Sequence, residues 1–544
     1  MATTRAHRTV IVGGVAAGMS AATRLRRNDE SREILVLERG DHVSFANCGL
    51  PYHLGGAIAD RDDLLLQSPE GLRDRFRLDV RVRHEVQRID RAGRTVTVRN
   101  RSTDETVEIA YDELVLATGA APVRPPIPGV DQAHVLRDLA DMDAIAASLD
   151  TAATAVILGG GFIGLELAEN LGQRGIAVTI VELADQILAP LDPEMAAPVA
   201  EHLRRHGIRI RSGVGATAIE SGAVRLDDGG VLPADVVIAA IGVRPESTLA
   251  RDAGLAVGGR GGVVVDDHQR TSDPHIFAVG DVAEKIDALT GGETLVPLAN
   301  TANRHGRLVA DVIGGRSTRA RPALGTAVVG VFGMTAAATG SNEKRLRALG
   351  HRFRAIHTHP ANHAGYYPGA EPMALKLLVD PDTDAILGAQ GVGGHGVDKR
   401  IDVISTAMRG GLTAADLADL ELAYAPQFGS AKDPVTMLGM IADNLAGGER
   451  TVQWHEVDRA IEDGTTLVDV RSPAEFADGA IPKSVNIPLD ELRIRAAEIP
   501  AGPVIVTCAV GQRGHTAGRL LGQLGRDVAN LDGGYRTWAA GALR

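Results

Sequence analysis

The stretch that decides the fold is Ala155-Val-Ile-Leu-Gly-Gly-Gly-Phe-Ile-Gly-Leu-Glu166. A short apolar run leads into glycines with G-x-G-x-x-G spacing, which is typical of the turn between a strand and a dinucleotide-binding helix. Glycines there let backbone amides at the helix start approach a pyrophosphate. A second strand pattern, Val178-Thr-Ile-Val-Glu182, ends in a carboxylate suited to hold a ribose diol. We therefore predict a nicotinamide-dinucleotide site formed by Gly159, Gly161, Gly164 and Glu182.

A similar turn lies nearer the N-terminus, in Val10-Ile-Val-Gly-Gly-Val-Ala-Ala-Gly18, and the strand pattern Ile34-Leu-Val-Leu-Glu38 follows it. Val15 stands where the middle glycine is usual, so this motif alone is weaker evidence. Two such units in one chain nevertheless predict two nucleotide-binding domains. At the first we expect contacts to the nucleotide from Gly13, Ala16, Ala17, Gly18, Glu38 and Arg39.

The composition is that of an α/β protein. The chain has 544 residues, enough for three or four domains, with 44% apolar residues, 64 glycines and 3% aromatic residues. Its net charge of -12 argues against a nucleic-acid partner. No apolar run reaches the ~18 residues of a membrane span, and the first strand pattern begins at Thr9 without a signal peptide before it. We expect a cytoplasmic protein with no membrane partner.

Only two cysteines occur, Cys48 in Ser44-Phe-Ala-Asn-Cys-Gly-Leu-Pro-Tyr52 and Cys508 in Thr507-Cys-Ala-Val-Gly-Gln-Arg513. Neither has a second cysteine nearby in the sequence, so a disulfide at Cys48 must form with a small molecule. We expect Cys48 to open a helix, whose unpaired amides would favour the thiolate. The two loops together indicate sulfur chemistry, and free thiols suit a reducing compartment.

Two further stretches carry a family resemblance, Tyr111-Asp-Glu-Leu-Val-Leu-Ala-Thr-Gly-Ala120 and Thr271-Ser-Asp-Pro-His-Ile-Phe-Ala-Val-Gly-Asp281. With them the chain resembles the pyridine nucleotide–disulfide oxidoreductases, in which an Ala-Thr-Gly stretch closes the FAD domain and the Asp of a Gly-Asp pair binds the flavin ribityl chain. The resemblance implies FAD at the first site and NADH, with NADPH possible, at the second. It further implies FAD contacts from Thr118, Gly119, Asp281, Pro297, Leu298 and Ala299.

The loop from Ser44 to Tyr52 resembles that of the coenzyme A-disulfide reductases and the related NADH oxidases and NADH peroxidases, which use one redox cysteine. The likeness covers residues 8 to 445 and implies a homodimer in which Cys48 reacts beside the flavin, with coenzyme A as substrate or bound ligand. It also implies that tyrosines of the partner subunit shape the disulfide pocket. The matching positions are Tyr424 and the Tyr366-Tyr367 pair, of which we favour Tyr366; packing at the dimer interface is the alternative.

The same resemblance implies a binding surface for coenzyme A. Its phosphates would contact arginines of the first helix and a pair on a later helix, although a solvated surface charge is the alternative for an arginine. The residues concerned, together with two from the cysteine loop, are Arg26, Arg27, Asn303, Arg307, Ser44 and Asn47.

The last ninety-odd residues resemble rhodanese domains. Leu467-Val-Asp-Val-Arg471, Glu475-Phe476, Gly479-Ala-Ile-Pro482 and the loop from Cys508 to Arg513 occur in the family order. Successive amides of a loop this short are expected to surround the cysteine sulfur and stabilise a thiolate or persulfide. We predict sulfur transfer at Cys508 with Arg513 in the site; a noncatalytic rhodanese-like module is the alternative.

The predicted fold is α/β, with two Rossmann-like domains, an α+β dimerisation domain and a C-terminal rhodanese-like α/β domain. The expected boundaries are 1–150 and 263–324 for the FAD domain, 151–262 for the NAD domain, 325–446 for dimerisation and 450–544 for the rhodanese domain. The histidines at 357, 359 and 363 cluster, but no Cys, Asp or Glu completes a ligand set nearby, so we predict no metal site.

The predicted function is NADH-dependent reduction of coenzyme A persulfide, polysulfide or coenzyme A disulfide through FAD and Cys48, fused to a sulfurtransferase. This resembles coenzyme A-disulfide reductase/persulfide reductase fusions. One alternative is an NADH oxidase or peroxidase that cycles Cys48 through a sulfenic acid. Another is a sulfur-relay or redox-sensing protein, in which the flavin half sets the state of Cys508 for a partner.

Glu182 should make NADH the preferred donor, because a carboxylate at the ribose repels the 2′-phosphate of NADPH. The Glu182→Ala variant should therefore narrow the gap in kcat/KM between NADH and NADPH in steady-state assays. A wild-type protein already faster with NADPH would contradict this reading of the carboxylate.

Overall fold

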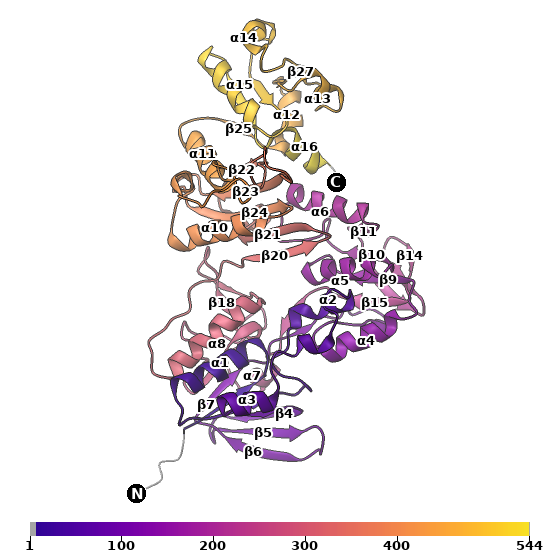
Figure 1. The fold of residues 1–544 in the computed structure, drawn as a ribbon, viewed down its shortest axis with the longest axis vertical. Coiled ribbons are helices and arrows are strands. Elements are labelled where there is room, and N and C mark those ends of the chain that lie inside the picture. Colours follow the sequence, from indigo (N-terminus) through magenta and orange to yellow (C-terminus); the bar gives the residue numbers. More distant parts are fainter. Residues whose placement is uncertain (1–6, 543–544) are drawn as a thin grey trace. The chain divides into compact units, whose positions relative to one another are not determined.

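The computed structural model describes residues 7–542, and Figure 1 shows the order of the elements along the chain. These residues form two compact units. One contains the described residues up to 185 together with 207–325, and the other contains 186–206 together with the described residues from 326 onward. No helix among residues 7–542 has the length and apolar character needed to cross a membrane.

The first unit contains a five-stranded parallel sheet in the order β17-β7-β1-β2-β3. Both faces of its central strand, β1 (Arg8–Val12), are covered, in keeping with the apolar residues from Val10 to Val12. Ile11 faces α1 (Ala16–Asn28) and α8 (Ala299–Ile313), which lie side by side (Figure 1). Val10 faces a three-stranded antiparallel sheet. The remaining strands of these two sheets are β2 (Glu33–Leu37), β3 (Asp79–Arg81), β7 (Glu113–Leu116), β17 (Ile276–Ala278), β4 (His84–Asp90), β5 (Thr95–Asn100) and β6 (Thr106–Ala110).

A second parallel sheet, in the order β11-β10-β9-β15, repeats the arrangement around the decisive stretch. Its strand β9 (Thr154–Leu158) leads through the glycines into α5 (Phe162–Gln173). A three-stranded antiparallel sheet packs against one face of it. The other strands are β10 (Ala177–Glu182), β11 (Arg209–Ser212), β15 (Val236–Ala239), β12 (Ala216–Glu220), β13 (Ala223–Leu226) and β14 (Val231–Pro233).

The second unit contains an antiparallel sheet in the order β20-β21-β24-β23-β22. Helices α10 (Val397–Gly410) and α11 (Pro434–Ala446) bury their apolar faces against it. The strands are β20 (Ala327–Val331), β21 (Met334–Gly340), β22 (Arg354–Thr358), β23 (Met373–Val379) and β24 (Ile386–Gly393).

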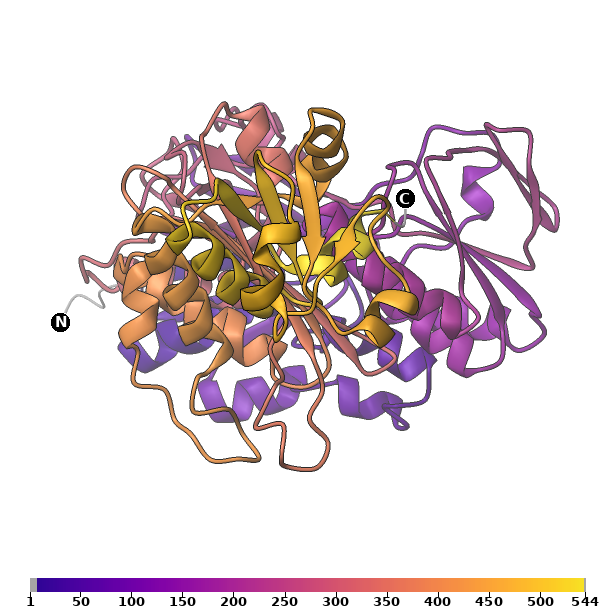
Figure 2. The ribbon, with the colours of Figure 1, turned by 90° about the horizontal axis from the view of Figure 1, so that it is seen from above.

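The same unit ends in a parallel sheet in the order β25-β29-β28-β26-β27, drawn in gold and yellow in Figure 2. Helix α15 (Gln512–Gln523) packs on one face, and α12 (Val457–Glu462) and α16 (Gly534–Ala542) pack on the other. The strands are β25 (Thr451–Val452), β26 (Thr466–Asp469), β27 (Val485–Asn486), β28 (Val504–Thr507) and β29 (Val528–Leu531).

The predicted α/β class is confirmed, and the structure contains both parallel and antiparallel sheets. One segment differs from the expected plan. Residues 186–206, which we assigned to the NAD domain, group with the second unit. There α6 (Pro193–Arg205) packs against α16 and β24, because its buried face presents Met195 and Val199 together with an acidic side chain that has a partner in β23.

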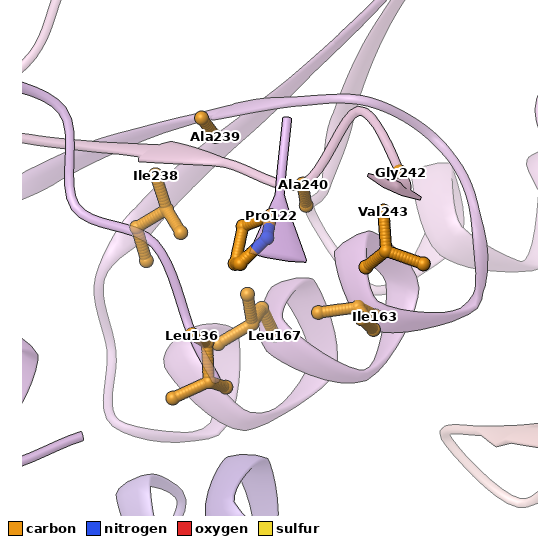
Figure 3. A pocket seen from close by; sticks show the side chains of 9 residues that line it. All are labelled: Pro122, Leu136, Ile163, Leu167, Ile238, Ala239, Ala240, Gly242 and Val243. Atoms are coloured by element: carbon orange, nitrogen blue, oxygen red, sulfur yellow. The ribbon is translucent and has the colours of Figure 1, made fainter. Parts of the chain in front are cut away.

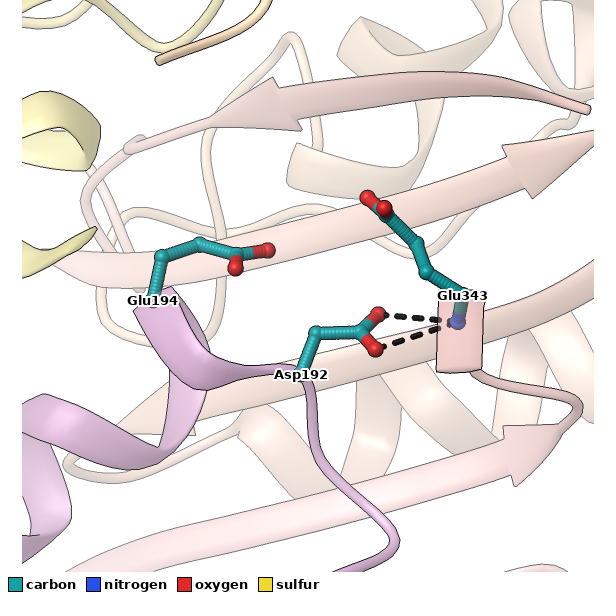
Figure 4. A group of neighbouring side chains, drawn as sticks. All are labelled: Asp192, Glu194 and Glu343. Carbon is teal, nitrogen blue, oxygen red and sulfur yellow. Dashed lines mark hydrogen bonds between the residues drawn. The ribbon is translucent and has the colours of Figure 1, made fainter. Parts of the chain in front are cut away.

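That partner is Lys376, which is fully buried among three carboxylates. Its Nζ lies 2.9 Å from Asp192, 2.5 Å from Glu194 and 2.6 Å from Glu343. Figure 4 shows the three acids converging, with the backbone amide of Glu343 donating to Asp192. Three clustered carboxylates are a typical cation site, and here the ammonium is the cation among them. Burial alone would lower the pKa of Lys376, but the three acids outweigh it and raise the pKa.

Replacing Lys376 by Met should destabilise the second unit by roughly 3–5 kcal/mol, because the acids would remain buried without a counter-charge. Urea denaturation at pH 7 measures the change, with the exposed Lys432→Met as a matched control expected to stay within about 0.5 kcal/mol of wild type. The loss should shrink at lower pH as the acids are neutralised. A Lys376→Met protein as stable as the control would contradict the cluster's role.

Candidate functional site

The N-terminal Gly-rich turn is held by a carboxylate. Glu38 accepts the amides of Gly14 and Gly40, both at 2.8 Å. Gly13 has φ +105°, and a Cβ there would lie 2.2 Å from the carbonyl oxygen of Ala117, so only glycine fits. Val15 has φ -109°, outside the left-handed region, so no positive φ requires a glycine there.

The second turn repeats this geometry. Glu182 accepts the amides of Gly160 at 2.7 Å and Ala184 at 2.8 Å. A Cβ on Gly164 would lie 2.1 Å from the carbonyl oxygen of Gly159, whereas a Cβ on Gly161 would meet no described residue within 4 Å. The open side of Gly161, together with the start of α5, is therefore the place where a pyrophosphate fits.

A small apolar pocket lies beside this second turn (Figure 3). Ile163 and Leu167 of α5 line it together with Ile238 of β15 and Val243. It sits at the carboxyl end of a parallel strand, where dinucleotides bind in folds of this kind.

Asp281 has a buried carboxylate oxygen that bears on whether the first unit fits a flavin. Its Oδ1 is buried and has no hydrogen-bond partner among residues 7–542. Burial raises its pKa, an effect that Lys285 opposes only in part. A buried carboxylate oxygen of this kind needs a donor, and a polyhydroxyl chain such as the flavin ribityl group supplies one.

The other expected FAD contacts surround the same region. Thr118 donates to the carbonyl of Glu246 at 2.8 Å, and Gly119 has φ +72°. Arg39 lies 3.4 Å from Glu246 at the surface. Leu298 caps the start of α8. The residues present therefore fit FAD at the first site and a nicotinamide dinucleotide at the second.

Cys48 lies in a one-turn helix, Asn47–Gly49, directly before α2 (Leu50–Leu54). The residue is solvent-exposed, and its Sγ donates to Oδ1 of Asn47 at 3.8 Å. Nearby, the hydroxyl of Tyr52 donates to Glu166 of α5 at 3.2 Å. Ser44 adopts φ +49°, and its amide donates to the carbonyl of Gly14, which ties the cysteine loop to the first Gly-rich turn.

The expected shift of Cys48 toward the thiolate is wrong for this environment. Partial removal of water raises the pKa of Cys48, and the carboxylates of Glu166 and Asp281 raise it further. These effects on the pKa of Cys48 outweigh the stabilisation of its thiolate by the backbone amides of so short a helix.

Of the expected coenzyme A contacts, Arg26 requires correction. It is 5% exposed, and its guanidinium donates to four backbone carbonyls, those of Phe76, Asp29, Glu30 and Arg77, so it fixes the chain instead of presenting charge to a phosphate. By contrast, Arg27 is exposed and stacks over Phe76 at 5.4 Å.

The two expected contacts on α8 lie at the surface. Asn303 Oδ1 accepts from Ser20 of α1 at 2.5 Å, and Arg307 is exposed. The Nδ2 of Asn303 donates to the carbonyl of Ala299 at 2.9 Å, so of the two Arg307 is the one that presents its charge to an anionic ligand.

In the second unit the structure brings two of the three expected tyrosines together. The hydroxyls of Tyr366 and Tyr424 lie 2.9 Å apart, whereas Tyr367 packs edge-on against His363. Tyr366 is 76% exposed, and Phe428, which follows Tyr424 closely in the sequence, is exposed as well. Exposed aromatic side chains in such numbers are typical of a surface that another molecule covers.

Cys508 follows β28 and is fully buried. Its carbonyl accepts the amide of Tyr535 at 2.7 Å, and the carbonyl of Gly511 accepts from Asn530 at 3.0 Å. The loop is therefore held by Asn530 of β29 and by Tyr535, which follows that strand, while Gly511, with φ +89°, turns the chain into α15.

Arg513 contacts the cysteine loop from a fixed position. It donates to both oxygens of Glu475, at 2.8 and 2.6 Å, and interacts with Cys508. The Arg513 hydrogen bonds lower the pKa of Glu475 to about 2, so the pair stays ionised at neutral pH. Glu475 is itself fixed by a capping box with Ser472.

Sequence reasoning missed several residues that form these sites. Glu166 directly follows the helix-start glycines, and Tyr52 closes the quoted cysteine loop, but no local pattern shows that they meet. Glu475 stood within the quoted rhodanese motif without an assigned role. The partners of the clustered histidines, Glu194 and Asp532, lie too far along the chain for any spacing rule to find them.

Family models match most of the chain. Residues 7–306 match pyridine nucleotide-disulphide oxidoreductase, 326–434 match the dimerisation domain of the same family, and 453–541 match the rhodanese-like domain. A coenzyme A disulfide reductase of Staphylococcus aureus (strain JH9) is 34% identical over 433 residues, covering 79% of this chain and 98% of the relative.

Two solved structures resemble the whole chain, including its C-terminal domain. One is the reduced CoADR-RHD of Bacillus anthracis, with a TM-score of 0.97 and 48% identity over 98% of both chains. The other is a NAD-dependent persulfide reductase from A. fulgidus, with a TM-score of 0.92 and 36% identity over 98% of this chain and 100% of the other. The chain therefore belongs to the pyridine nucleotide-disulphide oxidoreductase family, as a flavin- and NAD(H)-dependent member with a rhodanese domain after its dimerisation domain.

Proposed function

We propose that this protein uses NADH to reduce coenzyme A disulfide, coenzyme A persulfide or polysulfide at Cys48, and that its rhodanese domain transfers sulfane sulfur at Cys508. One observation carries the proposal. Cys48 is exposed and is the only cysteine before the rhodanese domain, so the disulfide that it forms must be with a small molecule. The coenzyme A disulfide reductase and persulfide reductase named above support the choice of substrate.

FAD, when bound, supplies a two-electron relay between nicotinamide and disulfide. The chain's part is to hold the two nucleotides. Glu38 and Asp281 would hold the flavin nucleotide through its hydroxyl groups, and Glu182 would hold the ribose of NADH. The apolar pocket beside α5 would exclude water from the nicotinamide end.

Cys48 acts as the nucleophile. Its thiolate attacks one sulfur of coenzyme A disulfide, the sulfur–sulfur bond breaks, and one coenzyme A leaves as a thiolate. Two electrons that originate from NADH then cleave the mixed disulfide, which releases the second coenzyme A and restores the Cys48 thiolate. With coenzyme A persulfide, the first leaving group is hydrosulfide.

The substrate surface would include residues of both subunits of a homodimer. Arg27, Asn303 and Arg307 are exposed and suit the phosphates of coenzyme A, while Tyr366 and Tyr424 of the partner subunit would flank the disulfide. The exposed aromatic cluster and the match to a dimerisation domain support this assembly. The two free thiols suit a reducing compartment such as the cytoplasm.

At the rhodanese site, the Cys508 thiolate attacks the sulfane sulfur of a donor, which leaves as a thiolate, and a Cys508 persulfide forms. An acceptor thiolate then takes the outer sulfur and restores Cys508. Arg513, fixed by Glu475, would neutralise the anionic donor.

The decisive experiment compares substrates. NADH oxidation by the purified protein should be fast with coenzyme A disulfide or coenzyme A persulfide and slow with oxygen or peroxide alone. Rapid oxygen consumption would instead favour an oxidase that cycles Cys48 through a sulfenic acid. Absence of multiple turnovers with every thiol substrate would favour a sulfur-relay or redox-sensing role.

The Cys48→Ser variant should keep its flavin and should still be reduced by NADH, because hydride arrives from the nicotinamide side. Its turnover of coenzyme A disulfide or persulfide should fall by at least about a hundredfold, as expected for loss of a nucleophile. Stopped-flow flavin absorbance and steady-state NADH oxidation measure the two steps. Turnover above about a hundredth of the wild-type value would contradict the assignment of Cys48 as the nucleophile.

The Cys508→Ser variant should lose sulfur transfer from thiosulfate or a persulfide donor by at least about a hundredfold while keeping coenzyme A disulfide reduction within about twofold. Only the first reaction needs the loop from Cys508 to Arg513. The two variants serve as controls for each other, and equal loss of both activities in Cys508→Ser would contradict two separate thiol sites.

A further inference from the structure

A buried ion pair joins the rhodanese domain to the antiparallel sheet. The backbone amide of His357, in β22, donates to both carboxylate oxygens of Asp532, at 3.1 and 3.0 Å, and its Nδ1 lies 2.6 Å from Oδ2. On the other side of the ring, Nε2 lies 3.0 Å from Glu194 of α6. His357 and Asp532 are each 3% exposed, so this contact is closed to water.

His357 carries a positive charge in this setting. Burial alone would lower its pKa, but Asp532 and Glu194 outweigh burial and the opposing charge of Lys376, and the pKa rises to about 9. Both ring nitrogens therefore donate, one to each acid.

The neighbouring histidine behaves differently. Burial, His357 and Arg536 lower the pKa of His359 to about 3, so it is neutral and bonds to Thr537 of α16 at 2.7 Å. The acids Asp192 and Glu343 face His357 only through Lys376. Two histidines of the sequence cluster, His357 and His359, thus contact the rhodanese domain.

Asp532 begins the segment that packs against the Cys508 loop. Three and four residues later, the amides of Tyr535 and Arg536 donate to the carbonyls of Cys508 and Ala509, at 2.7 and 3.0 Å. Between Asp532 and Tyr535, the chain packs tightly against the Cys508 loop on one side and against His357 on the other. A Cβ on Gly534 would lie 2.4 Å from the carbonyl oxygen of Cys508, and one on Gly533 would lie 2.8 Å from the Cβ of His357.

A second tie acts on the same carboxylate. The Gln453 side-chain amide, at the start of the rhodanese domain, donates to Asp532 at 3.1 Å and to the carbonyl of Ala355 in β22 at 3.2 Å. The segment from Asp532 to Arg536 is therefore clamped between β22 and the loop that carries the reactive sulfur.

We propose that His357 is a positioning residue of the sulfurtransferase site: its contact with Asp532 holds the segment that shapes the Cys508 loop. The dimerisation domain thus completes a site in the domain that follows it. The inference rests on the proposed sulfur transfer at Cys508 but not on the reductase chemistry at Cys48.

The test uses the full chain with His357→Gln, Asp532→Asn and the double variant. Each single change should lower kcat for sulfur transfer from thiosulfate by at least about tenfold with a smaller effect on KM, because the donor site itself is untouched. NADH-dependent reduction of coenzyme A disulfide should stay within about twofold. The double variant should lose less than the product of the single losses, because it removes both charges together. His351→Gln, which changes an exposed histidine three residues before β22 in the same domain as His357, is the matched control.

Folding of the rhodanese domain can be followed separately in these variants. Both tryptophans of the chain, Trp454 and Trp538, lie in that domain, so tryptophan emission reports its state while flavin absorbance reports the first unit. A His357→Gln or Asp532→Asn protein with native emission and wild-type sulfur transfer would overturn the positioning role. Sulfur transfer that survives in the Cys508→Ser variant would instead overturn the proposed sulfur transfer at Cys508, on which the role of His357 rests.

A further test uses the wild-type protein and needs no substitution. The folded pKa of His357 lies above its ordinary value near 6.5, so its stabilising charge is fully present below about pH 6.5 and is lost as pH rises through about 9. Hydrogen exchange at residues 508–511 and 532–536, corrected for the intrinsic effect of pH, should accelerate across that range. Exchange that stays constant to pH 10 would contradict the proposal even if every variant unfolded.

Discussion

Close contact between backbone atoms at the two Gly-rich turns is the constraint on which both nucleotide sites depend. In each turn a helix-start glycine lies against the carbonyl of the glycine that ends the strand, with 1.9 Å left for a Cβ at Gly18 and 2.1 Å at Gly164. No side chain fits in that space, so the helix approaches the strand closely and its first amides are exposed at the sheet edge. Glu38 and Glu182 then fix the loop by accepting amides from both sides of it.

The two thiols occupy opposite environments, and this difference suits their separate chemistry. Cys48 is exposed in a loop where the carboxylates of Glu166 and Asp281 disfavour its thiolate, so positive charge near the sulfur would favour its reaction. Cys508 is buried at the base of a loop fixed by hydrogen bonds from Tyr535 and Asn530 and by the ionised pair of Arg513 with Glu475. The first thiol lies at the surface, and the second is enclosed.

Most of the architecture could be predicted because local sequence patterns determine it. The strand patterns at residues 9–13, 34–38, 155–158 and 178–182 became β1, β2, β9 and β10, since apolar runs next to glycine turns have few other solutions. The errors arose where the deciding partner is distant in sequence. Arg26 resembled a phosphate ligand, but its guanidinium donates to four backbone carbonyls, two of which lie some 50 residues away in the sequence. His357 lacked a local acid, and its acids come from residues more than 150 positions before and after it.

The placement of residues 186–206 has a consequence for how the chain can be divided. This segment is encoded inside the first unit but supplies Asp192 and Glu194 to the core of the second. A gene fragment that begins at residue 326 would therefore produce a protein in which Lys376 lacks two of its three acids and His357 lacks one of its two. No single cut releases either unit whole, so recombination between relatives preserves this architecture only when it exchanges the middle segment and the C-terminal half together.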